Sequence, residues 1–82
     1  MMETTIEISM YPLREEYEDA ILEFVDFLNE QGLEVRVNET STHLFGDYDL
    51  VFDALKEGIR ASFEKYGIAV FVLKVLNGNL KA

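Results

Sequence analysis

The feature that most constrains this chain is the order of its hydrophobic patterns, which alternate as in strands or repeat as in helices. Over 82 residues the order is strand, helix, strand, strand, helix, strand. The segments fall at residues 4–11, 15–30, 33–38, 41–46, 48–66 and 68–76. This order is typical of the α+β ferredoxin-like βαββαβ arrangement. Because strand crossovers are right-handed, we expect a four-stranded antiparallel sheet in the order 4-1-3-2, with both helices on one face.

Residues with strong conformational preferences mark the ends of these segments. Pro12 closes the first strand because proline cannot donate to a sheet ladder. Gly32 and Gly67 follow the two helices, at the position where a left-handed residue commonly ends a helix. Asp47 directly precedes the second helix, so we interpret it as an N-cap rather than as a ligand group.

Length, charge and cysteine content exclude several classes of function. A chain of 82 residues is expected to form one domain, residues 1–82, around a single core. The net charge of −9 argues against a nucleic-acid partner, which requires a basic surface. Cysteines are absent, which excludes disulfides and thiolate metal sites. The first residues show no leader pattern, and no apolar run approaches the roughly 18 residues of a membrane span. We therefore expect a cytoplasmic protein without a membrane partner.

The last strand is apolar on both faces. Its two alternating sets of side chains are Ala69, Phe71, Leu73 and Val75, and Ile68, Val70, Val72 and Leu76. A sheet face exposed to water normally carries polar residues. We therefore expect another copy of the chain to cover the open sheet face, giving a homodimer or a homotetramer.

Polar side chains gather at one pole of the predicted sheet. The first strand runs antiparallel to the third and fourth, so its C-terminal end meets their N-terminal ends. The candidate ligand-binding residues at this pole are Ser9, Tyr11, Asn38, Glu39, Ser41 and Thr42. Hydroxyls, a carboxylate and an amide beside an aromatic ring suit a small heteroaromatic ligand. A second interpretation stays open, in which the Ser and Thr residues make turn and edge hydrogen bonds and Tyr11 only ends a strand.

The chain offers no catalytic or metal-binding pattern. His43 is the only histidine, and no cysteine or suitably spaced carboxylate accompanies it, so a structural position facing a partner explains it better. A cysteine nucleophile, a glycine-rich phosphate loop and a serine elbow motif are all missing. We predict a binding protein rather than an enzyme, with no metal and no cofactor.

Three segments carry a family resemblance. Residues 8–13 (ISMYPL), 41–49 (STHLFGDYD) and 51–56 (VFDALK) resemble motifs of the YkoF-type thiamin/hydroxymethylpyrimidine-binding proteins. The resemblance implies a ferredoxin-like subunit that assembles by packing its sheets and binds thiamine or its pyrimidine precursor without transforming it. It assigns Ser9, Tyr11, Ser41 and Thr42 to the aminopyrimidine, as hydrogen-bonding and stacking groups. Asn38 and Glu39 join them from the geometry of the pole.

Two functions follow from these observations. The first is non-catalytic binding of thiamine or its hydroxymethylpyrimidine moiety by a small cytoplasmic oligomer. The second is a ferredoxin-like regulatory or oligomerisation module whose main partner is another protein. A saturable ligand would favour the first, and a large apolar sheet face without a pocket would favour the second.

Overall fold

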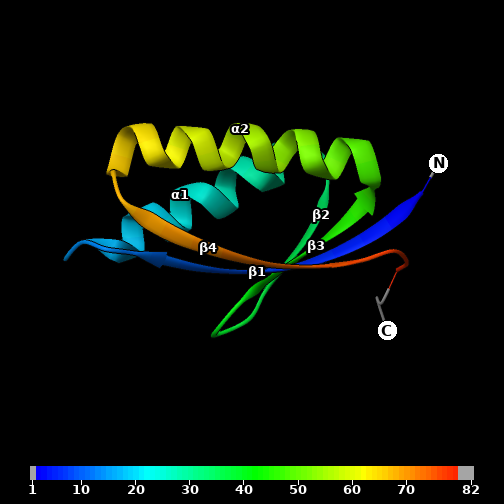
Figure 1. Cartoon of the computed structure of the whole chain (residues 1–82), viewed down its shortest axis with the longest axis horizontal. Helices are drawn as coiled ribbons and strands as arrows, with labels where there is room; N and C mark the ends of the chain where they lie inside the picture. Colours follow the sequence, from blue (N-terminus) through cyan, green and yellow to red (C-terminus); the bar gives the residue numbers. More distant parts are fainter. Residues whose placement is uncertain (1, 80–82) are drawn as a thin grey trace.

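A computed structural model describes residues 2–79 of the chain, and its six elements follow the predicted order (Figure 1). The elements are β1 (Glu3–Pro12), α1 (Tyr17–Glu30), β2 (Glu34–Val37), β3 (Thr42–Asp47), α2 (Tyr48–Tyr66) and β4 (Ala69–Leu76). The four strands form one sheet in the order β2-β3-β1-β4, and every neighbouring pair is antiparallel. Both helices cover the same face of this sheet. The ferredoxin-like fold predicted from the sequence is confirmed.

The ends of α2 follow from its flanking residues. Asp47 has an extended backbone, and its Oδ2 accepts a hydrogen bond from the Leu50 N–H at 3.3 Å. Gly67 ends the helix with a φ of 83°, a left-handed conformation that costs glycine little. The predicted cap and the predicted glycine stop are therefore both confirmed.

The start of α1 differs from the prediction by two residues. The helix begins at Tyr17 instead of residue 15, behind a Glu16 N-cap that makes no side-chain cap hydrogen bond. Glutamate is a poor N-cap residue, because the favoured side chains are the short ones of Ser, Thr, Asp and Asn. The acidic run that suggested an earlier start lies partly in the turn before the helix.

The core lies between the helices and the sheet. Ile6, Ile8 and Leu44 point from the central strands toward the helices and are almost completely buried. Phe24 and Leu28 of α1 and Val51 and Leu55 of α2 meet them from the other side. The alternation of β1 sends Glu7, Ser9 and Tyr11 to the opposite sheet face, which no helix covers.

The two edges of the sheet differ. The β2 edge is four residues long and carries Glu34 and Arg36, which form an ion pair at 3.0 Å. The β4 edge is eight residues long and has one charged residue, Lys74. On the uncovered face Val70 and Val72 are each 48% exposed. The predicted apolar character of both faces of β4 therefore holds in the folded chain.

No helix within residues 2–79 combines the length and the hydrophobicity needed to cross a membrane.

Candidate functional site

The β2–β3 hairpin forms one wall of a hollow beside α1. Its tip is closed by a hydrogen bond from the Asn38 N–H to the carbonyl of Ser41, at 2.8 Å. Glu39 and Thr40 form the exposed turn between these two residues. The pairing of Val37 with Thr42 continues the hairpin into the sheet. Short polar residues between two strands are typical of such a hairpin connection.

The hollow has a volume of about 110 Å³ and combines a polar rim with an apolar interior. Hairpin residues on the rim are Asn38, Glu39, Thr40, Ser41 and Thr42. Apolar residues from β1, α1 and β2 complete the lining: Ile8, Met10, Ile21, Phe24, Val25 and Val37. Pockets for small ligands are typically apolar with a few placed polar groups, and this hollow has that composition.

The pleat of the sheet places Thr42 inside the hollow. Thr42 pairs with Ile8, so both side chains lie on the helix-covered face. Only 8% of Thr42 is exposed. Thr42 therefore lies at the inner end of the rim, whereas Asn38, Glu39 and Ser41 are more exposed to solvent.

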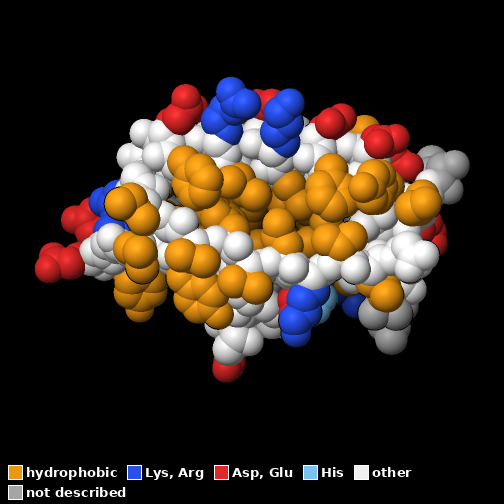
Figure 2. All heavy atoms as spheres, viewed as in Figure 1, with side chains coloured by type: hydrophobic (Ala, Val, Ile, Leu, Met, Phe, Trp, Pro, Cys, Tyr) orange, Lys and Arg blue, Asp and Glu red, His pale blue; other side chains and the backbone are white. Residues whose placement is uncertain are grey.

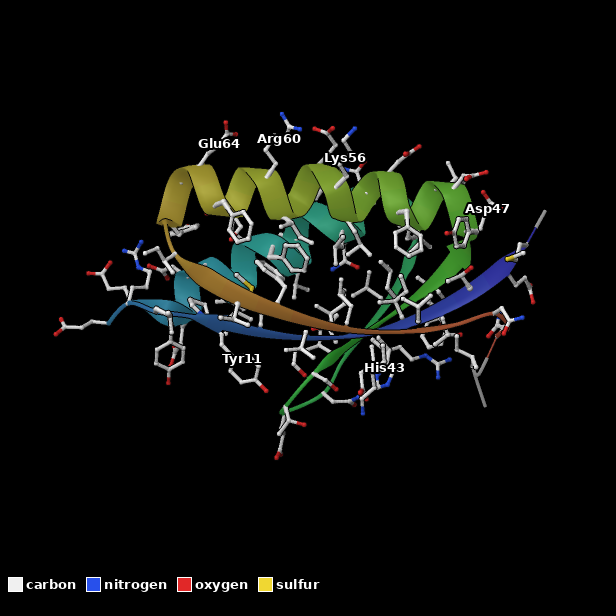
Figure 3. The ribbon with its side chains drawn as sticks, viewed as in Figure 1. Tyr11, His43, Asp47, Lys56, Arg60 and Glu64 are labelled. Carbon is white, nitrogen blue, oxygen red and sulfur yellow. The ribbon has the colours of Figure 1, made fainter. Side chains whose placement is uncertain are left out.

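Ser9 and Tyr11 lie on the other face of the sheet. Met10 lines the hollow, and its neighbours along an extended strand must point away from it. Figure 3 shows Tyr11 below the sheet, on the side opposite the helices. Tyr11 is 54% exposed. The structure thus brings together Asn38, Glu39, Ser41 and Thr42, and it leaves Ser9 and Tyr11 on the uncovered face.

A row of polar contacts connects the hairpin to the uncovered face. The Asn38 side-chain amide lies 2.9 Å from His43 Nδ1, and His43 Nε2 lies 3.3 Å from a carboxylate oxygen of Glu7. The other oxygen of Glu7 lies 3.3 Å from Lys74 Nζ. Figure 3 shows His43 on the same side of the sheet as Tyr11. The contact with His43 thus holds the Asn38 side chain toward the uncovered face.

Sequence reasoning missed the apolar lining of the hollow. Ile21 and Val25 belong to the predicted apolar stripe of the first helix, and such a stripe does not distinguish core positions from pocket positions. Met10 alternates with Ile6 and Ile8, a pattern that fits a core position and a pocket position equally well. Ile21, Val25 and Met10 line the hollow because α1 packs beside β2 and the polar hairpin.

The titratable groups with shifted pKa values lie elsewhere, between the middle of α1 and the C-terminal end of α2. Glu23 of α1 accepts hydrogen bonds from Lys65 Nζ at 2.8 Å and from the Tyr66 hydroxyl. The Lys65 ammonium, followed by the Tyr66 hydroxyl, holds the pKa of Glu23 below its ordinary value. The same hydrogen bonds raise the pKa of Lys65 and of Tyr66. In residues 2–79 no group of three or more His, Cys, Asp or Glu side chains is placed to hold a metal ion.

Several solved structures share this fold. Protein SP2199 from Streptococcus pneumoniae aligns with a TM-score of 0.87 and 21% identity, over 96% of this chain and 90% of that chain. A candidate thiamine biosynthesis/salvage protein from Thermotoga maritima aligns with a TM-score of 0.82 and 19% identity, over 94% and 84%. A DUF77 domain of unknown function from Bacillus cereus aligns with a TM-score of 0.80 and 16% identity, over 93% and 76%. Identities this low establish the fold alone.

No curated protein matches the sequence at a significant level. A family model does match it, over residues 3–72, a range that includes all three motifs. The matched segment contains both helices, the first three strands and the hairpin hollow. The chain therefore belongs to the YKOF-related family.

Proposed function

We propose that this protein binds thiamine, or the hydroxymethylpyrimidine moiety of thiamine, in the hairpin hollow and does not transform it. The observation that carries the proposal is the grouping of Asn38, Glu39, Ser41 and Thr42 around one apolar hollow. Membership of the YKOF-related family supports it, and so does the structural likeness to the Thermotoga maritima protein.

The chemistry of the hollow suits an aminopyrimidine ring. A carboxylate such as Glu39 accepts hydrogen bonds from an exocyclic amine, and hydroxyls and amide groups can both donate to and accept from ring substituents. The apolar side chains of Met10 and Ile21 offer surfaces for a flat ring. Drug-sized ligands occupy pockets of roughly 300–1,000 Å³. The hollow is smaller, at about 110 Å³, so we expect it to hold a single ring and to leave the rest of thiamine at the rim.

A non-catalytic role fits the groups at the hollow. Glu39 is exposed in the turn, and the groups with shifted pKa values, Glu23, Lys65 and Tyr66, line a different hollow between the helices. General acid–base catalysis works best with a group whose pKa is tuned close to the reacting atom. The hairpin hollow is better suited to hold a ligand than to move protons.

The proposal includes a homo-oligomer that packs through the uncovered sheet face. Val70, Val72 and Tyr11 expose apolar surface there, each close to or above half of its area. A second copy on this face would bring Ser9 and Tyr11 next to the partner subunit. In such an assembly these two residues would lie at the subunit interface and not at the hairpin hollow.

A regulatory or oligomerisation module is the second candidate function. The exposed apolar surface of β4 is the observation in its favour, because it would fit a protein partner without any small molecule. Under this alternative the hairpin hollow would have no specific ligand.

A thermal-shift series distinguishes the two. Thiamine, hydroxymethylpyrimidine and thiamine phosphates are compared with unrelated amino acids. At a hundredfold excess over its dissociation constant, a ligand stabilises the native state by about 2.7 kcal/mol, which raises the Tm of a domain of this size by about 10–20 °C. A shift restricted to the thiamine series is expected. The absence of any shift would contradict the binding proposal and favour the protein-partner module.

A further inference from the structure

The two helices leave a second hollow between them, which we call the inter-helix hollow. Its volume is about 110 Å³. The residues that form its walls recur at helical spacing on the facing sides of α1 and α2: Ala20, Phe24 and Phe27, and Gly58, Ala61 and Ser62. Of the described residues, Phe24 alone lines both this hollow and the hairpin hollow. The inter-helix hollow is therefore a distinct candidate site.

The sides of α2 differ in chemistry. Figure 3 shows Lys56, Arg60 and Glu64 on the outer side of the helix. Figure 2 shows a hydrophobic band below this charged row, over the flank of α2 that adjoins β4. The side toward α1 carries the small residues Gly58 and Ala61, which leave the space that the inter-helix hollow occupies.

Ser62 is the unusual residue of the inter-helix hollow. It is 6% exposed, and within residues 2–79 its Oγ has no hydrogen-bond partner. A serine in a helix can donate to the carbonyl four residues earlier, here that of Gly58, but Ser62 does not make this bond. A buried hydroxyl without a partner costs free energy. A ligand atom that bonds to Ser62 would remove this cost, so the hydroxyl indicates a ligand with a polar group.

The charged groups at the rim are already paired with each other. Glu23 accepts hydrogen bonds from Lys65 Nζ, at 2.8 Å, and from the Tyr66 hydroxyl. Among the described residues that line the hollow, Glu23 and Lys65 alone carry a charge. A charged ligand would therefore meet no unpaired counter-ion, and burying its charge beside apolar walls is unfavourable. The rim favours an uncharged ligand.

The walls suit one flat ring. Phe24 and Phe27 supply aromatic surface, and Ala20 and Ala61 supply small apolar side chains. Aromatic rings pack well against one another in offset or edge-to-face arrangements. An apolar cavity of about 150 Å³ can hold benzene. The inter-helix hollow is of similar size, so it matches a single six-membered ring.

We propose that the inter-helix hollow binds a small aromatic alcohol, of the size and chemistry of phenol, whose hydroxyl exchanges a hydrogen bond with Ser62 Oγ. The ring then lies against Phe24 and Phe27. An aminopyrimidine would leave its ring nitrogens and amine unpartnered at these apolar walls, which is costly. The two hollows therefore take different ligands. The inference goes beyond the proposed function and does not depend on it.

The first test is an NMR titration of the ¹⁵N-labelled wild type with phenol. Saturable shifts are expected at the amides of Ala20, Phe27, Ala61 and Ser62. Benzoate, which has the same ring and a negative charge, is expected to bind about tenfold more weakly. The proposal fails if phenol gives no saturable shifts at these amides, if its shifts are confined to residues 38–42, or if benzoate binds as tightly.

A titration of the same sample with hydroxymethylpyrimidine keeps the two proposals apart. Its shifts report the hairpin hollow at residues 38–42, so one site can fail while the other is retained. Saturable hydroxymethylpyrimidine shifts at Ala61 and Ser62 would contradict the separation of ligands and overturn the inference.

The second test removes the buried hydroxyl. Ser62→Ala is expected to weaken phenol binding about fivefold, the effect of one lost hydrogen bond, and to leave toluene binding unchanged. Without ligand its Tm is expected to equal or exceed that of the wild type, because alanine favours the helix and no hydroxyl is left unpartnered. Ser9→Ala, on the uncovered face, is the control and should bind phenol normally. A Ser62→Ala protein with wild-type phenol affinity, or with a lowered Tm, would overturn the role of this hydroxyl.

The third test fills the hollow and does not depend on Ser62. Ala61 is exposed at its edge, so a larger side chain there does not disturb the core. Ala61→Leu is expected to weaken phenol binding about tenfold by occupying the space of the ring. Lys56→Leu places the same side chain on the outer side of α2 and should bind phenol as the wild type does. Undiminished binding by Ala61→Leu would show that phenol does not occupy this hollow.

Discussion

Gly58 is the single residue that most directly controls how closely the two helices approach each other. A Cβ atom on Gly58 would lie 3.0 Å from one ring carbon of Phe27 and 3.1 Å from one of Phe24. Phe24 is 4% exposed and its ring contacts that of Phe71 at a centroid distance of 5.1 Å, so it has little freedom to move. Glycine here permits the contact of the two helices that buries these rings.

Gly58→Ala is therefore expected to destabilise the fold. Alanine improves helix propensity by about 1 kcal/mol, but overpacking costs about 1–3 kcal/mol. We expect a net loss of about 1 kcal/mol in the free energy of unfolding, measured by urea denaturation. Gly78→Ala is the control, because a Cβ there meets no atom within 4 Å. A Gly58→Ala protein more stable than the wild type would show that the helix contact is looser than described.

Ser41 and Ser9 provide a matched pair for locating the ligand site. Ser41 lines the hairpin hollow, whereas Ser9 is on the uncovered face. Loss of one hydrogen bond is worth about 1 kcal/mol, so Ser41→Ala is expected to weaken thiamine binding about fivefold in calorimetry. Ser9→Ala is expected to bind as the wild type does. The reverse order of effects would move the site to the uncovered face.

Glu23 makes part of the stability depend on pH. Its pKa in the folded chain is lowered by Lys65 and Tyr66, so its contribution is present above the unfolded pKa, near 4.5, and is lost as pH falls through the folded value. The raised pKa values of Lys65 and Tyr66 give contributions that are present below about pH 10 and are lost at higher pH. Glu23→Gln is expected to lower the Tm at neutral pH and to have no effect once pH is below the folded pKa. An equal difference in Tm across the whole acid range would contradict this assignment.

Most bounds of the helices and strands could be predicted from the sequence. The alternation in residues 4–11 identifies β1 and its two faces, and Asp47 and Gly67 locate the ends of α2. The start of α1 was less predictable, because the acidic residues before Tyr17 are compatible with a helix or with the turn that leads into it. Long periodic segments are determined by their own residues, whereas a weakly capped end depends on the surrounding packing.

Asp47 is expected to contribute to stability through α2. Asp47→Ala removes the acceptor for the Leu50 N–H and should lower the free energy of unfolding by about 1 kcal/mol. Asp47→Asn keeps an oxygen acceptor and should retain most of this stability. Chemical denaturation of the three proteins checks the prediction, and a wild-type stability for Asp47→Ala would exclude a role in capping.

At the scale of the whole molecule, the sheet divides the predicted site. The predicted strand ends bring six polar residues to one pole, whereas the alternation of side chains along each strand divides them between the two sheet faces. That alternation already separates Ser9 and Tyr11 from Met10. The hollow itself could not be predicted from one sequence, because its size depends on how α1 packs beside the hairpin.

The two faces of the sheet carry different groups. The helix-covered face contains the core and the hairpin hollow, and the uncovered face carries the contacts from Asn38 through His43 and Glu7 to Lys74. Asn38 lines the rim of the hollow, and its side-chain amide contacts His43 on the uncovered face, so one residue connects the two faces.

The hairpin hollow is proposed to bind the pyrimidine moiety of thiamine. An NMR titration of the ¹⁵N-labelled protein with hydroxymethylpyrimidine tests it most directly, because each amide reports its own surroundings. We predict saturable shifts at residues 38–42 of the hairpin and at Ile21 and Val25 of α1. The absence of saturable shifts, or shifts confined to Ser9, Tyr11 and the uncovered face, would contradict the account.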